Sequence, residues 1–130
     1  RFIILCTRIA REKFSVSPER EKAFDMVRQF YVLVDNHFKE KKMVQDYANM
    51  LHRSPKTLSN LFTTCGLPSP LRIIHERIEA EAKRLLLYSQ KSAKEITEIL
   101  GFEDQATFSR FFKKMTGESV SEYRKREKQE

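Results

Sequence analysis

The sequence is poor in the residues that turns, disulfide frameworks and membranes need. Its 130 residues include three glycines, four prolines, two cysteines and no tryptophan. Cys6 and Cys65 are too few for a disulfide framework, so we expect reduced thiols in a cytoplasmic protein. No apolar run approaches the ~20 residues of a membrane span, which predicts no membrane partner. Because strand-like alternation is also missing after the first few residues, the sequence predicts an all-α fold.

The sequence also lacks the motifs of common catalytic and metal sites. The three histidines are His37, His52 and His75, and neither they nor the cysteines have metal-ligand spacing. There is no phosphate-binding glycine loop and no nucleophile elbow. We therefore expect no enzyme, no metal and no cofactor. Several acidic residues are expected to lie solvated on helix surfaces: Glu79, Glu81, Glu95 and Glu98.

Positive charge is plentiful. The chain has 25 Lys and Arg against 18 Asp and Glu, a net charge of +7. This excess favours a polyanionic partner, although composition alone does not separate nucleic acid from an acidic protein or an anionic membrane. With 40% hydrophobic residues, the chain can bury one modest core or two small cores that share a helix.

One stretch near the C-terminus predicts a helix-turn-helix. A short amphipathic helix over residues 95–100 leads through Gly101 to a second helix, with Asp104 at its N-cap and Gly117 just past its end. The second helix has one apolar face and one polar, basic face. Its apolar residues are Phe108, Phe111, Phe112 and Met115. This spacing leaves the polar face free to meet a partner.

The same pattern occurs about 50 residues upstream. Residues 57–62 align with residues 107–112, with Thr and Ser identical and every apolar position apolar. Ser54 and Pro55 predict the start of the upstream second helix, and Gly66 predicts its end. An isolated pattern of this kind also fits an ordinary helical hairpin. Its repetition favours two helix-turn-helix units.

The remaining segments predict further helices. One runs from Pro18 to about Glu40, and another, from Leu71 to about Tyr88, joins the two units. The apolar stripe of the joining helix is Leu71, Ile74, Ile78, Ala82, Leu85 and Leu86. A capping box at Ser119 and Glu122 predicts a final helix through Tyr123, followed by a frayed charged tail over residues 124–128. An apolar stripe over residues 2–13 predicts a truncated N-terminal helix.

The outward faces of the two second helices carry groups that suit DNA bases. Arg110 can contact guanine with two hydrogen bonds, and Asn60 or Gln105 can do the same for adenine. Ala106 and Thr107 can meet a thymine methyl group, although Thr107 fits a core position equally well. Other outward residues suit close backbone approach or phosphate contact. These are Ser59, Ser109, Thr63, Lys113 and Lys114.

At this point the sequence resembles the C-terminal DNA-binding domain of the AraC family of bacterial transcription regulators. The resemblance covers residues 44–124 and is most specific over 96–102, 105–114 and 117–124. It implies seven helices in two subdomains joined by a long linker helix, with recognition helices in two successive major grooves of double-stranded DNA. The base-reading positions that it implies are Lys56, Ser59, Asn60, Gln105, Ala106, Thr107 and Arg110.

The resemblance also implies a domain division. Residues 1–16 are the trailing helix of a companion domain or linker, and 17–130 form the DNA-binding domain. Within it, the first helix-turn-helix covers about 44–66, the linker helix about 70–88, and the second helix-turn-helix about 92–117. Expected partners are double-stranded DNA, RNA polymerase, and a companion domain or second copy bound through the N-terminal segment.

Three positions depart from the family pattern. Thr97 stands where the family commonly has alanine, Val120 replaces a proline, and the first turn, Leu51-His52-Arg53, has no glycine. Two alternatives to DNA binding remain open from the residues alone. One is a helical protein-interaction module with basic faces for an acidic partner, and the other is RNA binding.

Overall fold

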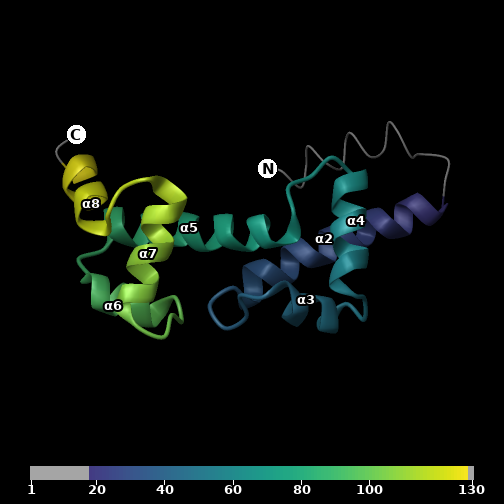
Figure 1. Cartoon of the computed structure of the whole chain (residues 1–130), viewed down its shortest axis with the longest axis horizontal. Coiled ribbons are helices and arrows are strands. Elements are labelled where there is room, and N and C mark those ends of the chain that lie inside the picture. Colours follow the sequence, from purple (N-terminus) through teal and green to yellow (C-terminus); the bar gives the residue numbers. More distant parts are fainter. Residues whose placement is uncertain (1–17, 129–130) are drawn as a thin grey trace. The chain divides into compact units, whose positions relative to one another are not determined.

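The computed structural model describes residues 18–128, with side chains described for residues 21–127. All regular secondary structure in this part of the chain is helical, as predicted (Figure 1). The helix predicted within residues 2–13 lies outside the described residues. The described helices are α2 (Pro18–His37), α3 (Val44–Met50), α4 (Pro55–Thr64), α5 (Pro70–Tyr88), α6 (Ala93–Ile99), α7 (Gln105–Thr116) and α8 (Val120–Lys128).

The helices form two compact units. Among the described residues, unit 1 comprises 18–37 and 41–74, and unit 2 comprises 38–40 and 75–128. Each unit contains one helix-turn-helix, α3–α4 in unit 1 and α6–α7 in unit 2. α5 begins in unit 1 and continues into unit 2 after Ile74. Two helix-turn-helix units joined by a long helix are therefore present, as predicted.

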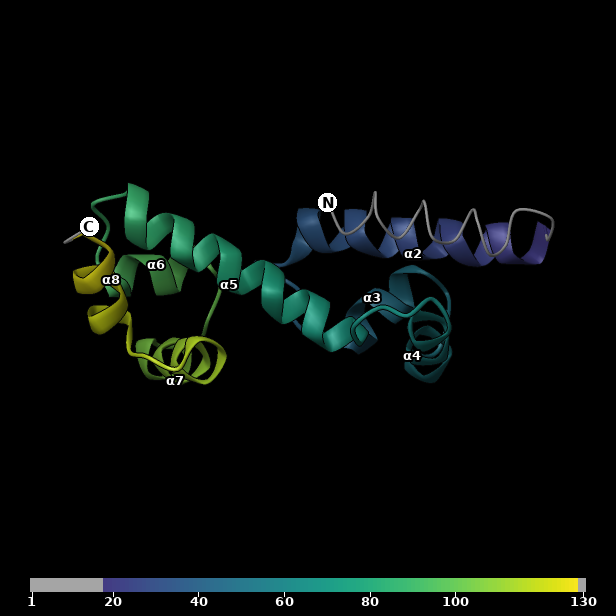
Figure 2. The ribbon, with the colours of Figure 1, turned by 90° about the horizontal axis from the view of Figure 1, so that it is seen from above.

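Aromatic side chains fill the core of unit 1. The Phe30 ring on α2 lies edge-on to Tyr47 of α3 at 5.5 Å and to Phe62 of α4 at 5.0 Å, measured between ring centroids. All three side chains are fully buried. The Tyr47 hydroxyl donates to the Lys41 carbonyl at 2.6 Å, so its polar end is satisfied. Figures 1 and 2 together show α4 crossing α2, which lets one face of α4 reach this core while the other stays outside.

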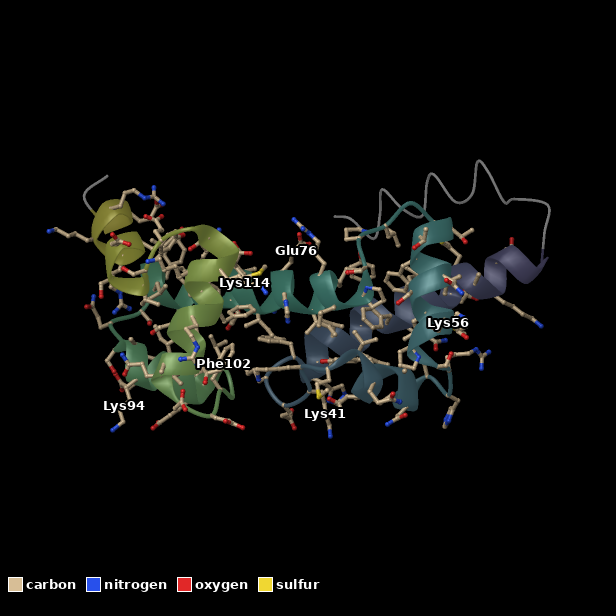
Figure 3. All side chains as sticks on the ribbon, viewed as in Figure 1. Lys41, Lys56, Glu76, Lys94, Phe102 and Lys114 are labelled. Atoms are coloured by element: carbon tan, nitrogen blue, oxygen red, sulfur yellow. The ribbon has the colours of Figure 1, made fainter. Side chains whose placement is uncertain are left out.

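The core of unit 2 is built around α7. Phe108 and Phe112 are fully buried, and the Phe112 ring meets Tyr123 of α8 edge-on at 5.4 Å. Phe102, which Figure 3 labels, lies in the turn before α7, and its ring centroid is 5.4 Å from that of Phe108. Arg124 of α8 donates from Nε to the Leu86 carbonyl at 3.0 Å. The ring contacts hold α7 by its apolar face and leave its polar face outside, and the Arg124 bond ties α8 to α5.

Local signals predicted the helix ends well. Ser92 and Glu95 form the capping box of α6, and Ser119 and Glu122 form an equivalent pair at α8. Two departures from the family pattern are accommodated. The Thr97 hydroxyl donates to the Ala93 carbonyl at 2.7 Å, so it is satisfied although buried. Val120 begins α8 and is 7% exposed, so it fills the position with apolar packing.

Several sequence predictions of detail are wrong. α2 ends at His37, before the expected Glu40, and Phe38 is buried in the turn that follows. Leu71 is 44% exposed, and Ile73, at 5%, is buried in the first turn of α5 instead. The charged tail is helical to Lys128 because Arg124 and Arg126 of α8 have partners in unit 2.

Glu81 also differs from its prediction. It is 8% exposed, although a solvated carboxylate was expected. Its two oxygens accept from Arg84 Nε at 3.1 Å and from Arg84 Nη2 at 2.6 Å. Arg77 approaches the same carboxylate at 3.7 Å while its guanidinium lies 4.3 Å from the centroid of the Phe38 ring. Two arginines on the same helix therefore supply the partners that let Glu81 leave water.

Candidate nucleic-acid interface

α4 offers a polar face in unit 1 that carries a single charge. Leu58 and Phe62 are fully buried, which turns the opposite side of the helix outward. The structure places each predicted residue of this helix on that exposed side: Lys56, Ser59, Asn60 and Thr63. Lys56 is the only cation among them, and Figure 3 labels it on the first turns of α4. Hydroxyl and amide groups therefore dominate this face.

The ends of α4 are fixed by the residues that the sequence singled out. The Ser54 side chain accepts from the Thr57 backbone N–H at 3.1 Å, and Pro55 occupies the first turn. Cys65 is the C-cap, and Gly66 follows with a φ of 72°. Burial raises the pKa of the Cys65 thiol, so this half-buried thiol stays protonated at neutral pH.

The hydroxyl groups of two threonines near the end of α4 already donate hydrogen bonds within the helix. The Thr63 hydroxyl donates to the Ser59 carbonyl, and the Thr64 hydroxyl donates to the Asn60 carbonyl, each at 2.9 Å. A phosphate oxygen only accepts, so a phosphate contact by Thr63 requires its hydroxyl to leave the Ser59 carbonyl. Phosphate binding by Thr63 would thus break its hydrogen bond to the Ser59 carbonyl, which the sequence did not reveal. The role of Thr63 remains a prediction.

α7 offers a basic face in unit 2. Gln105, Ala106 and Arg110 are exposed, as are both lysines of the last turns, Lys113 and Lys114. Thr107 and Ser109 are half-buried at the margin of this face. Thr107 therefore lies between its two predicted positions, because part of its side chain packs inward and part reaches the surface. Three cations on this helix contrast with the single one on α4.

The first turn of α7 contains a contact that sequence reasoning missed. The Thr107 backbone N–H donates to Asp104 Oδ1 at 2.7 Å, which caps the helix. Arg110 Nη2 donates to Thr107 Oγ1 at 3.4 Å. Hydrogen bonds from the Thr107 backbone, then from its side chain, and the nearby Arg110 charge lower the pKa of Asp104. The signal was present in the spacing, because residues three apart share a helix face.

The two turns that orient these helices have the same backbone form. His52 in the first turn has a φ of 57°, and Gly101 in the second has a φ of 80°. In both turns the following N–H reaches back to a helix carbonyl: Arg53 N to Ala48 O at 2.9 Å, and Phe102 N to Thr97 O at 3.1 Å. The missing glycine of the first turn therefore leaves its geometry intact.

Behind the basic face, α5 braces α7 with His75. The His75 ring lies edge-on to Phe111 at a centroid distance of 5.2 Å. Its partial burial, and to a smaller extent the charge of Lys114, lower the pKa of His75. A neutral imidazole at pH 7 follows, so His75 adds no charge to the basic face.

Residues 18–128 hold no cluster of histidine, cysteine, aspartate or glutamate that could bind a metal ion. Among the described helices, none is both long and apolar enough to cross a membrane. What the described residues do present is two capped helices, each the second of a helix-turn-helix and each with a polar outward face.

Comparison with known proteins decides the family. A sequence model described as a helix-turn-helix domain, of the AraC type, matches residues 47–126, from within α3 to within α8. The chain belongs to the AraC family of DNA-binding transcription regulators. It is similar to the helix-turn-helix transcriptional regulator YisR of Bacillus subtilis, at 30% identity over 122 residues. That alignment covers 93% of this chain and 41% of the relative.

Two further proteins support the assignment. The arabinose operon regulatory protein of Salmonella typhimurium is 36% identical over 92 residues, which are 71% of this chain and 31% of the relative. The solved C-terminal domain of AraT, a response regulator from Geobacillus stearothermophilus, matches with a TM-score of 0.69 and 29% identity. That match covers 77% of this chain and 84% of the AraT domain. The chain thus spans less than half of the length of YisR and of the arabinose operon regulatory protein, and it matches 84% of the AraT domain.

Proposed function

We propose that this chain binds double-stranded DNA sequence-specifically, with α4 and α7 each entering a major groove. The observation that carries the proposal is the pair of outward faces. Each belongs to the second helix of a helix-turn-helix, the element that enters the major groove in this class of domain. The residues proposed to read bases are Lys56, Ser59, Asn60, Gln105, Ala106, Thr107 and Arg110.

The side-chain chemistry of α4 and α7 suits some residues to base contacts and others to phosphate contacts. The Arg110 guanidinium suits guanine, whereas the Asn60 and Gln105 amides suit adenine. Lys113 and Lys114 suit phosphates, which fix register without reading sequence. Because the hydroxyl of Thr107 is already bonded, its methyl group is the part available for a thymine methyl.

The proposal extends to the cellular role in a limited way. Family members regulate transcription, and we propose the same for the intact protein, in the cytoplasm and without a catalytic step of its own. The relatives are longer than this chain. We therefore propose a companion domain in the same protein. We also propose RNA polymerase as a partner in regulation.

Selection from random duplex DNA tests the proposal. We expect enrichment of one sequence family with two conserved blocks about one helical turn, or roughly 10 base pairs, apart. Methylation interference on the selected duplex should then show major-groove contacts in both blocks on one DNA face. A chain that enriches no duplex, or that binds single-stranded RNA or an acidic protein in preference, overturns the proposal in favour of the alternatives.

A further inference from the structure

A chain of hydrogen bonds connects the cap of α7 to its arginine. Asp104, Thr107 and Arg110 follow one another at intervals of three residues on one helix face. Thr107 donates its backbone N–H to Asp104 Oδ1 at 2.7 Å. Its hydroxyl accepts from Arg110 Nη2 at 3.4 Å. Thr107 therefore links the two residues, because its backbone N–H is bonded to Asp104 and its hydroxyl to Arg110.

We propose that Asp104 and Thr107 are positioning residues that hold Arg110 for reading a base and so set the specificity of α7. The proposal rests on the DNA-binding function proposed above. An exposed arginine has many rotamers, and it loses that freedom when it binds. A tether that already restricts the side chain leaves less freedom to be lost, and it favours base pairs that match the tethered geometry.

The negative charge of Asp104 adds discrimination of a second kind. A carboxylate beside the DNA-facing helix repels phosphates, and this weakens binding to every sequence. At the preferred site, Arg110 contacts a base while it stays paired through Thr107, and the carboxylate remains compensated. On other sequences Arg110 moves toward phosphate and leaves Asp104 without that compensation. Specificity gains when the wrong complexes are destabilised more than the right one.

Unit 1 provides an internal comparison. Its corresponding residues are Ser54, Thr57 and Asn60, with the same spacing. The Ser54 hydroxyl lies 2.8 Å from the Thr57 hydroxyl and accepts from the Thr57 backbone N–H at 3.1 Å. The cap and the base-reading residue are both neutral there. Serine and aspartate cap helices about equally well, so capping alone does not require the carboxylate in unit 2.

The experiment separates positioning from capping. Asp104→Asn keeps a good N-cap residue and removes the charge, and Asp104→Ser installs the cap that α4 uses. Glu103→Gln is the matched control. It removes the same charge from the neighbouring residue, whose carboxylate is not part of the hydrogen bonds among Asp104, Thr107 and Arg110. Each variant of the 130-residue chain is titrated with the duplex that the unmodified chain selects from a random pool, and with a scrambled duplex of equal length.

We expect both Asp104 variants to bind scrambled DNA more tightly and to lose about tenfold in the ratio of preferred to scrambled affinity. Thr107→Val should lose a similar part of that ratio, because it keeps the shape and removes the hydroxyl. Glu103→Gln should leave the ratio unchanged. In an Arg110→Ala background, Asp104→Asn should have no further effect on the ratio, since the group that it positions is gone.

The outcomes distinguish this inference from the proposed function. If the unmodified chain selects a duplex but Asp104→Asn behaves like Glu103→Gln, the positioning role is wrong and DNA binding stands. The positioning role is also wrong if the ratio falls equally with and without Arg110. If the unmodified chain selects no duplex, the proposed function itself fails. Thermal melting of each variant checks folding, and unchanged melting together with a lower ratio supports positioning.

Discussion

His52 and Gly101 occupy the same place in two turns of the same backbone form, one turn after α3 and the other after α6. Both have positive φ, 57° for His52 and 80° for Gly101. A residue with a Cβ is strained in this left-handed region, and glycine is not. Replacing glycine with His52 therefore leaves the backbone of the first turn unchanged and strains it instead.

The strain predicts that His52→Gly stabilises the chain. Relief of the left-handed conformation exceeds the entropy that glycine adds to the unfolded chain, so we expect a gain of about 0.5–1 kcal/mol in the free energy of unfolding. Urea denaturation measures it. The reverse change in unit 2, Gly101→Ala, should destabilise by about 1 kcal/mol. A loss of stability in His52→Gly would show that its imidazole makes a stabilising contact.

Glu81 and Asp25 each pair with an arginine three residues later, but removing their carboxylates should change stability by different amounts. Glu81→Ala removes a carboxylate that is 8% exposed and that both Arg84 and Arg77 contact, and we expect a loss of about 1–2 kcal/mol in the free energy of unfolding. The Asp25 pair with Arg28 is exposed on both sides, so Asp25→Ala should cost less than about 0.5 kcal/mol. Equal effects in urea denaturation would contradict the assignment of Glu81 to the core.

Acid should destabilise the helix starts. Hydrogen bonds from the Ser92 and Ser119 backbone N–H groups are the main cause that lowers the pKa of Glu95 and Glu122 in the folded chain. A carboxyl with a lowered folded pKa contributes stability that is fully present above its unfolded pKa, near about 4, and is lost as pH falls through the folded value. We expect the melting temperature to fall between about pH 5 and pH 3. The double variant Glu95→Gln, Glu122→Gln should show a shallower fall.

Arg110 and Lys113 should have separable effects on DNA binding. Arg110→Ala should cost about 1–3 kcal/mol on the preferred duplex and relax preference at one or two base pairs. Lys113→Ala should weaken all duplexes alike and lower the slope of log affinity against log salt by about one. Competition binding at several salt concentrations measures both. The assignment is wrong if the two variants lose affinity and specificity in the same pattern.

Local rules predicted much of the fold. The N-caps Ser54 and Asp104 mark helix starts because each supplies an oxygen to orphan backbone N–H groups. The three-and-four spacing of apolar residues likewise placed Phe108 and Phe112 in the core. These signals are short-range, so a sequence displays them directly.

The predictions that were wrong concern residues whose burial depends on neighbouring side chains. Burial of Glu81 requires two arginines in particular rotamers, and exposure of Leu71 depends on which side chains reach the first turn of α5. The tether between Thr107 and Arg110 is also a matter of rotamer. Periodicity gives the face on which a residue lies, but not which partners that face will meet. The DNA-reading roles remain predictions for the experiments above.

The unequal distribution of cations between α4 and α7 has a consequence for the order in which DNA is released. Dissolved ions screen charges and leave amide and hydroxyl contacts nearly untouched. The outward face of α4 has Lys56 alone, whereas α7 has Arg110, Lys113 and Lys114. If α4 and α7 each enter a groove, as proposed, a rise in ionic strength should loosen α7 more than α4. At high salt concentration the contacts of α7 should then be lost before those of α4.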